Sequence, residues 1–327
     1  MLSFDSLIGQ DKAKKLLKNA VTNHKISHAY LFKGPTGVGK KSLAKIFAAY
    51  INCSSPIAKT GPCNNCPSCR KFQTDNHPDF IIIEPDGVSI KISQVRELKH
   101  SLNFPPYEAA YRVVLLPDIQ AMRREAANSL LKTLEEPPPN TILILCADEA
   151  SNILPTINSR CQIIPFFPLP YEQVAQLLAQ DGISPVEADT LAAISEGSIG
   201  RARLLASNEL LSLRREIIEN LLQTNLNNPE STEIVIALAE KSGKLKEDLS
   251  ELLDLLKIWL RDLVVTVNAR PDKTLSRDLA SALQFAKNRW TLPEIYHRLE
   301  QIDRAKRQLN RNCNRGLICE VLFFALL

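Results

Sequence analysis

The sequence is poor in aromatic residues, and no long apolar run interrupts it. Phe, Trp and Tyr make up 6% of the 327 residues, with no evident platform for stacking single-stranded bases. The closest approach to a membrane-spanning segment is residues 321–327, far short of the roughly 18 apolar residues such a helix needs. The first residues lack the apolar core of a secretory signal. We therefore expect a cytoplasmic protein without a membrane segment.

Neither sign of charge is in large excess. Lys and Arg number 40 and Asp and Glu 36, a formal net charge of +4. This balance permits contact with nucleic acid but is far below that of a dedicated polyanion binder. Apolar residues make up 45% of the chain, enough for a folded core. The length predicts about two domains, or three small ones.

Short apolar runs predict the strands of a parallel sheet in the first half of the chain. Runs that are apolar on both faces and separated by helices are typical of an α/β domain. The predicted strands are residues 29–32, 80–83, 112–116 and 141–146. The predicted helices between them include residues 41–50 and 121–136, the second stopped by three prolines.

Beyond residues 166–170 the strand signals stop and the pattern is helical. A helix start is marked by Ser184 and Pro185, and its end by Gly197. A polar stretch at 223–233 precedes two segments predicted as long amphipathic helices, 234–265 and 292–327. The predicted domains are an α/β domain at 1–167, a small helical domain at 168–207 and a larger helical domain at 208–327.

The segment between the first strand and the next helix fits the phosphate-loop pattern G-x-x-x-x-G-K. Glycines let backbone N–H groups surround an anion, the helix N-terminus adds positive potential, and the lysine reaches the outer phosphates. Asp118, at the end of a predicted strand, would face a metal ion. The candidate nucleotide-binding residues are Gly34, Thr36, Gly37, Val38, Gly39, Lys40, Lys41, Ser42 and Asp118.

Two departures weaken this site for hydrolysis. The Ser or Thr that holds Mg²⁺ in such loops is replaced by Lys41, and Ser42 comes one position late, turned by about 100° on a helix. Ile119 stands where a glutamate would polarise the attacking water. We expect no intrinsic ATPase activity. ATP or ADP would bind, if at all, without productive Mg²⁺. The alternative is an active ATPase in which Ser42 restores the metal site.

Four of the eight cysteines form a cluster with the spacing of a zinc module. Cys53, Cys63, Cys66 and Cys69 supply four thiolates, which fill a tetrahedral zinc site and leave no coordination position open. The pattern predicts structural Zn²⁺. An iron–sulfur cluster and unligated thiols are the alternatives.

Several motifs together resemble those of AAA+ clamp-loader ATPases, and among them the delta-prime family of bacterial DNA polymerase III. They include the entry segment at 4–10, the phosphate loop, the cysteine insertion, the run at 128–138, Ser-Arg-Cys at 159–161 and Gly-Arg at 200–201. The resemblance covers the first 207 residues. It implies an AAA+ P-loop domain with a zinc module, then a helical lid and a C-terminal helical collar. Lys41 and Ile119 favour delta-prime over the catalytic tau/gamma type.

The resemblance also implies a mechanism in a five-membered ring. Arg160 would act in trans as an arginine finger on the nucleotide of a neighbouring subunit, and Arg201 would touch a phosphate bound to its own subunit. The implied partners are tau/gamma and delta subunits, the sliding clamp and primed DNA, within a DNA polymerase holoenzyme. A third reading is a zinc-dependent nucleic-acid-binding module with a vestigial nucleotide fold.

Contact with DNA is predicted only coarsely. Basic residues gather on two predicted helices, and such charges more often form a solvated face. They are Lys12, Lys14, Lys15, Lys18, Arg96, Lys99 and His100.

Overall fold

The chain forms two compact units. The structure is a computed structural model that describes residues 1–55, 61–87, 89–148, 153–207, 210–223, 229–268, 274–311 and 313–327. Unit 1 comprises Met1–Gln173 and Gly197–Gly200, and unit 2 comprises Val174–Glu196 and Arg201–Leu327. The finer predicted division of the helical part at residues 207 and 208 stays a prediction.

Unit 1 is built on a five-stranded parallel sheet of order β2-β3-β4-β1-β5. The strands are β1 (Ala29–Lys33), β2 (Phe80–Ile82), β3 (Arg112–Leu116), β4 (Thr141–Ala147) and β5 (Gln162–Pro165). The predicted parallel sheet is confirmed, with the four predicted strands. The prediction missed β5 at the edge of the sheet, a strand of four residues with two isoleucines between Gln162 and Pro165.

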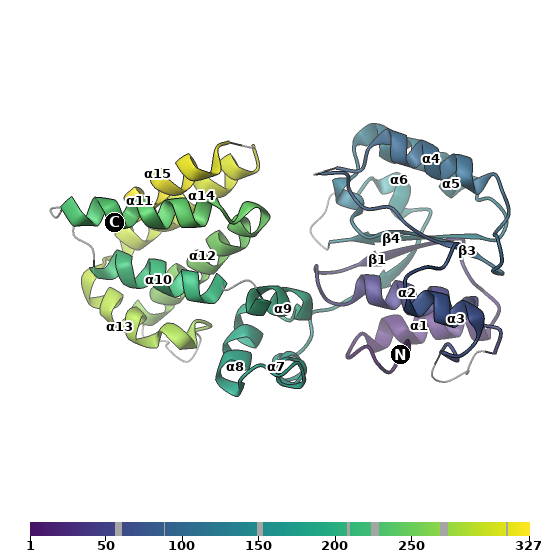
Figure 1. Cartoon of the computed structure of the whole chain (residues 1–327), viewed down its shortest axis with the longest axis horizontal. Helices are drawn as coiled ribbons and strands as arrows, with labels where there is room; N and C mark the ends of the chain where they lie inside the picture. Colours follow the sequence, from purple (N-terminus) through teal and green to yellow (C-terminus); the bar gives the residue numbers. More distant parts are fainter. Residues whose placement is uncertain are drawn as a thin grey trace. The chain divides into compact units, whose positions relative to one another are not determined.

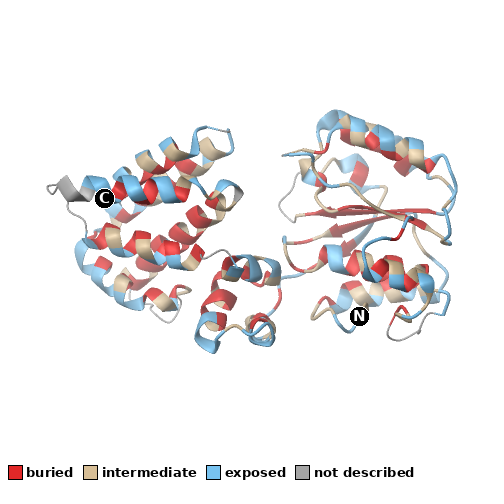
Figure 2. Cartoon of the chain, viewed as in Figure 1, coloured by how far each residue is buried: buried red, intermediate tan, exposed pale blue. Residues whose placement is uncertain are grey.

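Helices cover both faces of this sheet (Figure 1). The helices are α1 (Asp11–Thr22), α2 (Lys40–Ile51), α3 (Pro67–Gln73), α4 (Ile92–Leu102), α5 (Arg124–Glu135) and α6 (Pro155–Asn158). Successive strand residues point to opposite faces. Phe32 therefore packs in the core between the sheet and helices α1 and α2. Leu31 packs on the opposite face, in the core between the sheet and helices α4 and α5. The strands are buried throughout the middle of the sheet (Figure 2).

All five strands run the same way, so their carboxyl ends meet at one edge of the sheet. Because β1 lies beside β4, with Lys33 opposite Ala147, the segments that follow these strands are neighbours. Ligands of open parallel sheets bind at this edge. The phosphate loop follows β1 there, Asp118 follows β3 and Asp148 follows β4.

Helices account for the regular structure from α7 onward, and no strand occurs there in the described residues. The nine α-helices are α7 (Tyr171–Gln180), α8 (Pro185–Ile194), α9 (Ile199–Ser207), α10 (Leu210–Gln223), α11 (Pro229–Gly243), α12 (Leu249–Val267), α13 (Ala280–Arg289), α14 (Leu292–Leu309) and α15 (Arg315–Leu326). Within unit 2, α12 packs against α10, α13 and α14, and α15 packs against α11 and α14.

The predictions of single long helices at 234–265 and 292–327 are wrong. Each segment is two helices, broken between α11 and α12 and between α14 and α15. Lys246 has a φ of 52°, which a continuous right-handed helix cannot contain. At the end of α11, Gly243 packs so closely on Gly316 that a Cβ at position 243 would lie 3.2 Å from the Cα of Gly316.

The other predicted helix ends differ less. The start of α8 is as predicted, with the Ser184 hydroxyl accepting a hydrogen bond from the Glu187 N–H at 3.4 Å. The helix ends at Ile194, before the predicted Gly197. The predicted helix at 121–136 begins later, at Arg124, after a 3₁₀ turn (Ile119–Ala121). The predicted polar linker at 223–233 lies partly outside the described residues.

Candidate functional site

The phosphate loop curls between the end of β1 and the start of α2. Gly37 and Gly39 have φ angles of 75° and 100°, a left-handed conformation that glycine adopts without strain. At Gly34 the constraint is space, because a Cβ there would lie 2.3 Å from the Phe166 carbonyl oxygen. Val38 is buried and anchors the loop in the core. The predicted strand–loop–helix arrangement is thus present.

The amine of the loop lysine is almost fully enclosed. Only 8% of the Lys40 side chain is exposed, and its Nζ lies 3.3 Å from Oδ1 of Asp148. Nζ also donates to the Pro35 carbonyl at 2.8 Å and to the Gly34 carbonyl. An ammonium has three N–H donors, so these three oxygens satisfy it.

Lys41 occupies the position that a metal-binding hydroxyl takes in related loops. Its amine forms an ion pair with Oε1 of Glu84 at 2.7 Å, and both side chains are more than half exposed. The positive charge of Lys41, which we expect to repel Mg²⁺, is therefore paired with a carboxylate. Ser42, the next residue, is exposed.

The strand-end pair Asp118-Ile119 is split between a polar and an apolar environment. Oδ1 of Asp118 is buried and has no hydrogen-bond partner among the described residues. Burial raises the pKa of Asp118, and the charge of Asp148 adds to this, against the lowering effects of backbone N–H groups and Lys40. Ile119 is buried in the apolar core beneath α5. No side chain at position 119 can accept a proton from water.

Asp148 is a site residue that the sequence reading missed. Its Oδ1 accepts a hydrogen bond from the Thr36 hydroxyl at 2.7 Å as well as the Lys40 contact. Gln120 holds it from the other side, donating from Nε2 to Oδ2 at 3.0 Å and accepting from the Asp148 N–H at 3.3 Å. The available signal is its position directly after the fully buried strand β4.

The Gly-Arg pair at 200–201 makes two separate contacts. The Gly200 N–H donates to the Gly37 carbonyl at 2.9 Å, and a Cβ at Gly200 would lie 2.8 Å from the Gly37 Cα. Only glycine allows the backbone to approach the phosphate loop this closely. Within unit 2, Arg201 pairs with Glu251 at 2.6 Å and donates to the Ile194 carbonyl at 3.2 Å. Its role toward a nucleotide stays a prediction.

Arg160 lies just beyond α6 and is partly exposed. Its Nη2 pairs with Oε1 of Glu135 at 2.7 Å, and about a third of its side chain is accessible (34%). Its Nη1 donates to the Thr156 carbonyl at 2.9 Å and to the Ser159 hydroxyl at 3.2 Å. The guanidinium is thus oriented by three groups of its own chain while remaining in reach of solvent.

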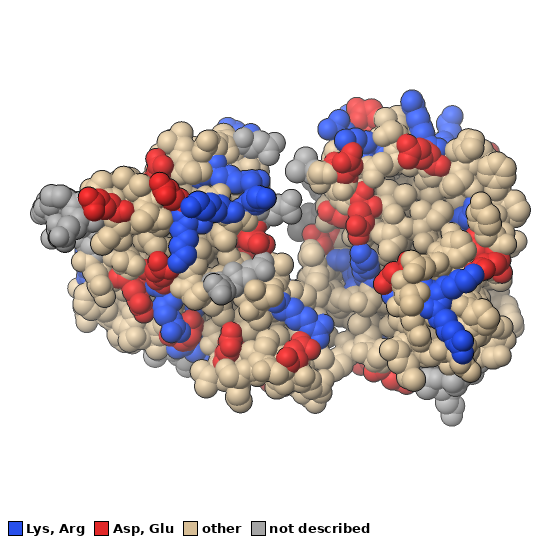
Figure 3. Space-filling model, viewed as in Figure 1, with Lys and Arg blue, Asp and Glu red and all other residues tan. Residues whose placement is uncertain are grey.

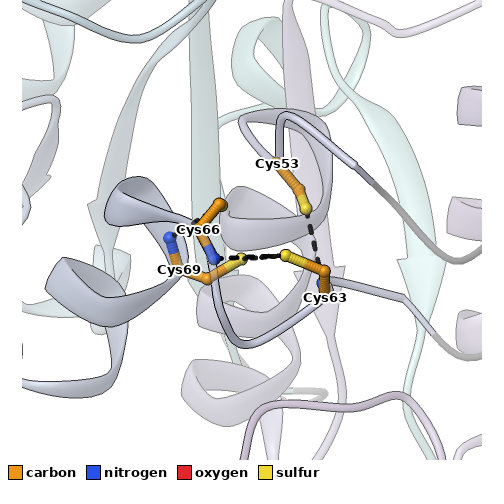
Figure 4. A group of neighbouring side chains, drawn as sticks. All are labelled: Cys53, Cys63, Cys66 and Cys69. Atoms are coloured by element: carbon orange, nitrogen blue, oxygen red, sulfur yellow. Dashed lines mark hydrogen bonds between the residues drawn. The ribbon is translucent and has the colours of Figure 1, made fainter.

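The four clustered cysteines converge, as the spacing predicts (Figure 4). All four Sγ atoms lie within 4.8 Å of one another, and Sγ of Cys63 lies 4.0 Å from that of Cys69. A tetrahedral zinc ion with Zn–S bonds of about 2.3 Å needs sulfurs roughly 3.7 Å apart, so the thiols fit such an ion after a small contraction. Four cysteines at this spacing can bind a metal ion such as zinc.

Backbone N–H groups of the cysteine cluster point at the sulfurs. The N–H groups of Cys63, Cys66 and Cys69 donate to Sγ of Cys53, Cys63 and Cys66 at 3.3, 3.4 and 3.4 Å. Burial acts to raise the pKa of Cys66, but hydrogen bonds from Ser54 and Cys69 outweigh it and lower the pKa to about 6. Hydrogen bonds also lower the pKa of Cys63, whereas burial raises the pKa of Cys53 and of Cys69. The thiolate, the form that binds metal, is therefore favoured at Cys63 and Cys66.

The cysteine segment is also tied to the start of the chain. Asn64 accepts from the Leu2 N–H at 2.8 Å and donates to the Leu2 carbonyl at 2.7 Å. A Cβ at Gly61 would lie 3.0 Å from the Phe4 ring, so the chain passes close to this buried aromatic residue. Order in the cysteine segment is therefore coupled to the packing of the first residues.

Comparison with known proteins places these features in one family. A family described as "DNA polymerase III, delta subunit" matches residues 9–170. The chain is 30% identical over 312 residues to the DNA polymerase III subunit delta-prime of Bacillus subtilis (strain 168), covering 94% of each chain. The chain belongs to the delta-prime family of DNA polymerase III subunits.

Two further relatives show how widely this fold is shared. The DNA polymerase III subunit tau of Bacillus subtilis is 40% identical over 165 residues, half of this chain and 29% of that longer one. A gamma subunit-related protein from Thermotoga maritima aligns over 97% of this chain and 98% of its own, with a TM-score of 0.51 and 20% identity. This second likeness concerns the fold alone. The tau subunit agrees with membership in a DNA polymerase III family, and the Thermotoga maritima protein agrees with the fold.

The basic residues predicted as DNA contacts stay a prediction. On α1, Nζ of Lys14 lies 3.6 Å from Oδ1 of Asp11, and Nζ of Lys18 lies 3.8 Å from Oδ1 of Asp5. On the face drawn in Figure 3, Lys and Arg alternate with Asp and Glu in both units. Among the described residues, no helix is long and apolar enough to span a bilayer.

Proposed function

We propose that this chain is a non-catalytic member of a clamp-loader ring that supplies Arg160 to the nucleotide of a neighbouring subunit. The non-catalytic assignment rests on the burial of Ile119 in the core at the strand end. Hydrolysis needs a carboxylate at this position to orient water. No such group is offered by that position, whatever binds at the phosphate loop.

The proposed action of Arg160 on a neighbouring subunit's nucleotide rests on the environment of this side chain. A guanidinium beside a γ-phosphate neutralises the charge that develops in the transition state, an effect of about 10³ to 10⁵ in other phosphoryl transfers. Arg160 is partly exposed and held in place by Glu135 and the Thr156 carbonyl. A phosphate brought by a neighbour would compete with Glu135 for the same N–H groups.

The names of the relatives, which are delta-prime and tau subunits of DNA polymerase III, support the choice of partners. We propose a five-membered ring with tau/gamma and delta subunits that loads a sliding clamp on primed DNA. The four-cysteine cluster would hold one structural Zn²⁺, because four thiolates leave no open coordination position for chemistry.

The test compares Arg160→Ala with Arg203→Ala in the reconstituted complex. Arg203 is a suitable control because it is also exposed and ion-paired, with Asp181 at 2.7 Å. Rapid-quench measurement should show Arg160→Ala slowing turnover at one nucleotide site by about 10³. The amount of ATP hydrolysed per complex in the burst would then fall by the contribution of that one site. Clamp loading should fall as well.

An unchanged burst and unchanged clamp loading with Arg160→Ala would contradict the role of Arg160. Steady ATP hydrolysis by the chain alone, at about 1 s⁻¹ or faster, would contradict the non-catalytic assignment and favour the active-ATPase alternative.

A further inference from the structure

The end of α14 and the start of α15 carry a concentration of positive charge. Five of the fourteen residues at 303–316 are Arg or Lys, against one Asp. The whole chain, by contrast, is nearly balanced, with 40 basic and 36 acidic residues. This local excess belongs neither to the phosphate loop nor to the cysteine cluster, and it lies on other helices than the basic residues predicted from the sequence.

The cations of this segment divide between two sides of α14. Where α14 packs against α12, Nζ of Lys306 lies 2.6 Å from Oδ1 of Asp254, and Nζ of Lys257 lies 2.6 Å from Oδ1 of Asp303. The other cations are exposed, and their side chains form no hydrogen bond or ion pair within the described part of the chain. They are Arg304, Arg307, Arg311 and Arg315.

A further exposed cation, Lys244, reaches the same place from the end of α11. It follows Gly243, whose close packing on Gly316 brings α11 against the start of α15. On the face drawn in Figure 3, Lys and Arg side chains gather over the end of α11 and the segment between α14 and α15. A hollow of about 430 Å³ lies there, lined by Gly243, Leu309, Cys313, Asn314, Arg315 and Gly316. The name basic row is used below for Lys244, Arg304, Arg307, Arg311 and Arg315.

Helix electrostatics account for only part of the basic row. The negative end of the helix dipole stabilises a cation in the last turn, and Arg307 lies in that turn of α14. Arg315 is instead the first residue of α15, where the positive end of the dipole disfavours a cation. Arg304 and Arg307 are three residues apart on α14, a spacing at which like charges repel. A bound polyanion would relieve both of these unfavourable arrangements.

We propose that the basic row binds the sugar–phosphate backbone of duplex DNA. A guanidinium presents paired N–H donors that fit a phosphate, and four of the five cations are arginines. Residues 304–311 span about 10 Å at 1.5 Å per helical residue, a length over which one strand of duplex DNA presents about three phosphates. The hollow beside Arg315 gives room for the bound strand.

This inference goes beyond the proposed function, which names no residue in contact with DNA, and it does not depend on Arg160. Contacts to phosphates carry no information about base sequence, so we expect the basic row to bind duplexes of any sequence. An acidic protein segment offers carboxylates instead of phosphates, and the experiment distinguishes this partner from DNA.

The experiment measures the binding of a short fluorescent DNA duplex to the full-length chain by anisotropy, over a series of salt concentrations. The test variant combines Arg307→Gln with Arg311→Gln and so removes two charges of the basic row. The control variant combines Lys91→Gln with Arg203→Gln, which removes two exposed charges that are each paired with an aspartate. All four side chains are exposed, so both variants should unfold at the wild-type temperature. The competitors are an unlabelled duplex of unrelated sequence and poly-L-glutamate.

We expect the wild type and the control variant to bind the duplex with nearly equal affinity. The logarithm of the binding constant should fall with the logarithm of the salt concentration, with a slope of about −0.9 for each phosphate contacted. The test variant should bind at least about tenfold more weakly at low salt, with a slope shallower by about 1.8. The unrelated duplex should compete fully, and poly-L-glutamate should compete poorly.

An unchanged salt slope in the test variant would overturn the proposal, as would a lack of duplex binding by the wild type at low salt. Equal weakening in both variants would show an effect of net charge alone and would also overturn it. Competition by poly-L-glutamate as strong as that by DNA, at the same concentration of charge, would assign the basic row to an acidic protein segment instead. None of these results bears on Arg160, whose test is ATP hydrolysis in the assembled complex.

Discussion

A buried carboxylate at Asp79 organises the loop between α4 and β3, and its removal should destabilise unit 1. Asp79 is fully buried and accepts the N–H groups of Tyr107, Glu108 and Ala109 at 2.7, 3.0 and 3.0 Å. It also lies 3.5 Å from the buried guanidinium of Arg112. Breaking a buried charge pair costs about 3–5 kcal/mol.

The expected cost of Asp79→Ala lies at the low end of that range. Arg112 keeps three carbonyl partners, those of Ser101, Phe104 and Pro105 at 2.6, 3.0 and 2.8 Å. The loop N–H groups can turn to water because they are not deeply buried. We therefore expect about 3 kcal/mol of lost unfolding free energy.

The two tryptophans make the assay specific for one unit. Trp259 and Trp290 are the chain's only tryptophans, and both lie in unit 2, so tryptophan fluorescence follows unit 2 while circular dichroism follows both units. In urea, Asp79→Ala should shift a dichroism transition and leave the fluorescence transition unchanged. The control is Asp75→Asn, which removes the charge of an exposed carboxylate paired with Lys45 at 2.7 Å. Asn tolerates the left-handed φ of 57° at this position, so the change should cost less than about 1 kcal/mol.

The same substitution has a defined pH dependence. Burial alone would raise the pKa of Asp79, but the loop N–H groups and Arg112 outweigh it and lower the pKa below its usual value. A lowered folded-state pKa gives stability that is present above the unfolded value of about 3.9 and is lost as the pH falls toward the folded value. The difference between wild type and Asp79→Ala should shrink below about pH 4. A difference that stays constant to pH 3, or a loss below about 1 kcal/mol at pH 7, would refute this account.

Two further predictions concern the cysteine cluster and the contact between Gly37 and Gly200 within unit 1. Metal analysis of protein purified without chelator should find about one zinc per chain. Cys63→Ser should lower the metal content and the thermal stability of unit 1 but not the tryptophan signal; a metal content near zero in the wild type contradicts this. Gly200→Ala should destabilise the chain by about 1–3 kcal/mol in urea, because its Cβ would lie 2.8 Å from Gly37. Gly316→Ala, whose Cβ has ordinary contacts, serves as the control. Equal stability of the Gly200→Ala and Gly316→Ala variants would contradict the close packing of Gly200 on Gly37.

Local sequence patterns predicted the strands that are continuous apolar runs, and they missed features that depend on contacts with other parts of the chain. Strands β2, β3 and β4 each hold a continuous apolar run, whether half-buried or fully buried. Strand β5, at the edge of the sheet, holds only two isoleucines between Gln162 and Pro165. The helix breaks near Gly243 and Lys246 come from packing and backbone conformation, which the apolar periodicity on either side does not record.

The candidate site divides in the same way. The phosphate loop and the four cysteines are contiguous motifs, so spacing alone predicted their geometry. The contact of Asp148 with Lys40 joins residues 108 positions apart. It exists because β4 lies beside β1 in the sheet, and no local pattern specifies strand order.

The two cations that matter for phosphate chemistry are both paired with carboxylates of their own chain, yet the pairs differ in strength. Lys40 is 8% exposed, and its partner Asp148 is fixed by Thr36 and Gln120. Arg160 and Glu135 are 34% and 48% exposed, and ion pairs of that kind contribute about 0–1 kcal/mol. Under the proposed role of Arg160, a triphosphate carried by a neighbouring subunit would displace Glu135 at little cost, because this ion pair is exposed. Glu135→Gln should accordingly leave stability within about 1 kcal/mol of wild type, and a larger loss would show that Arg160 is locked as firmly as Lys40.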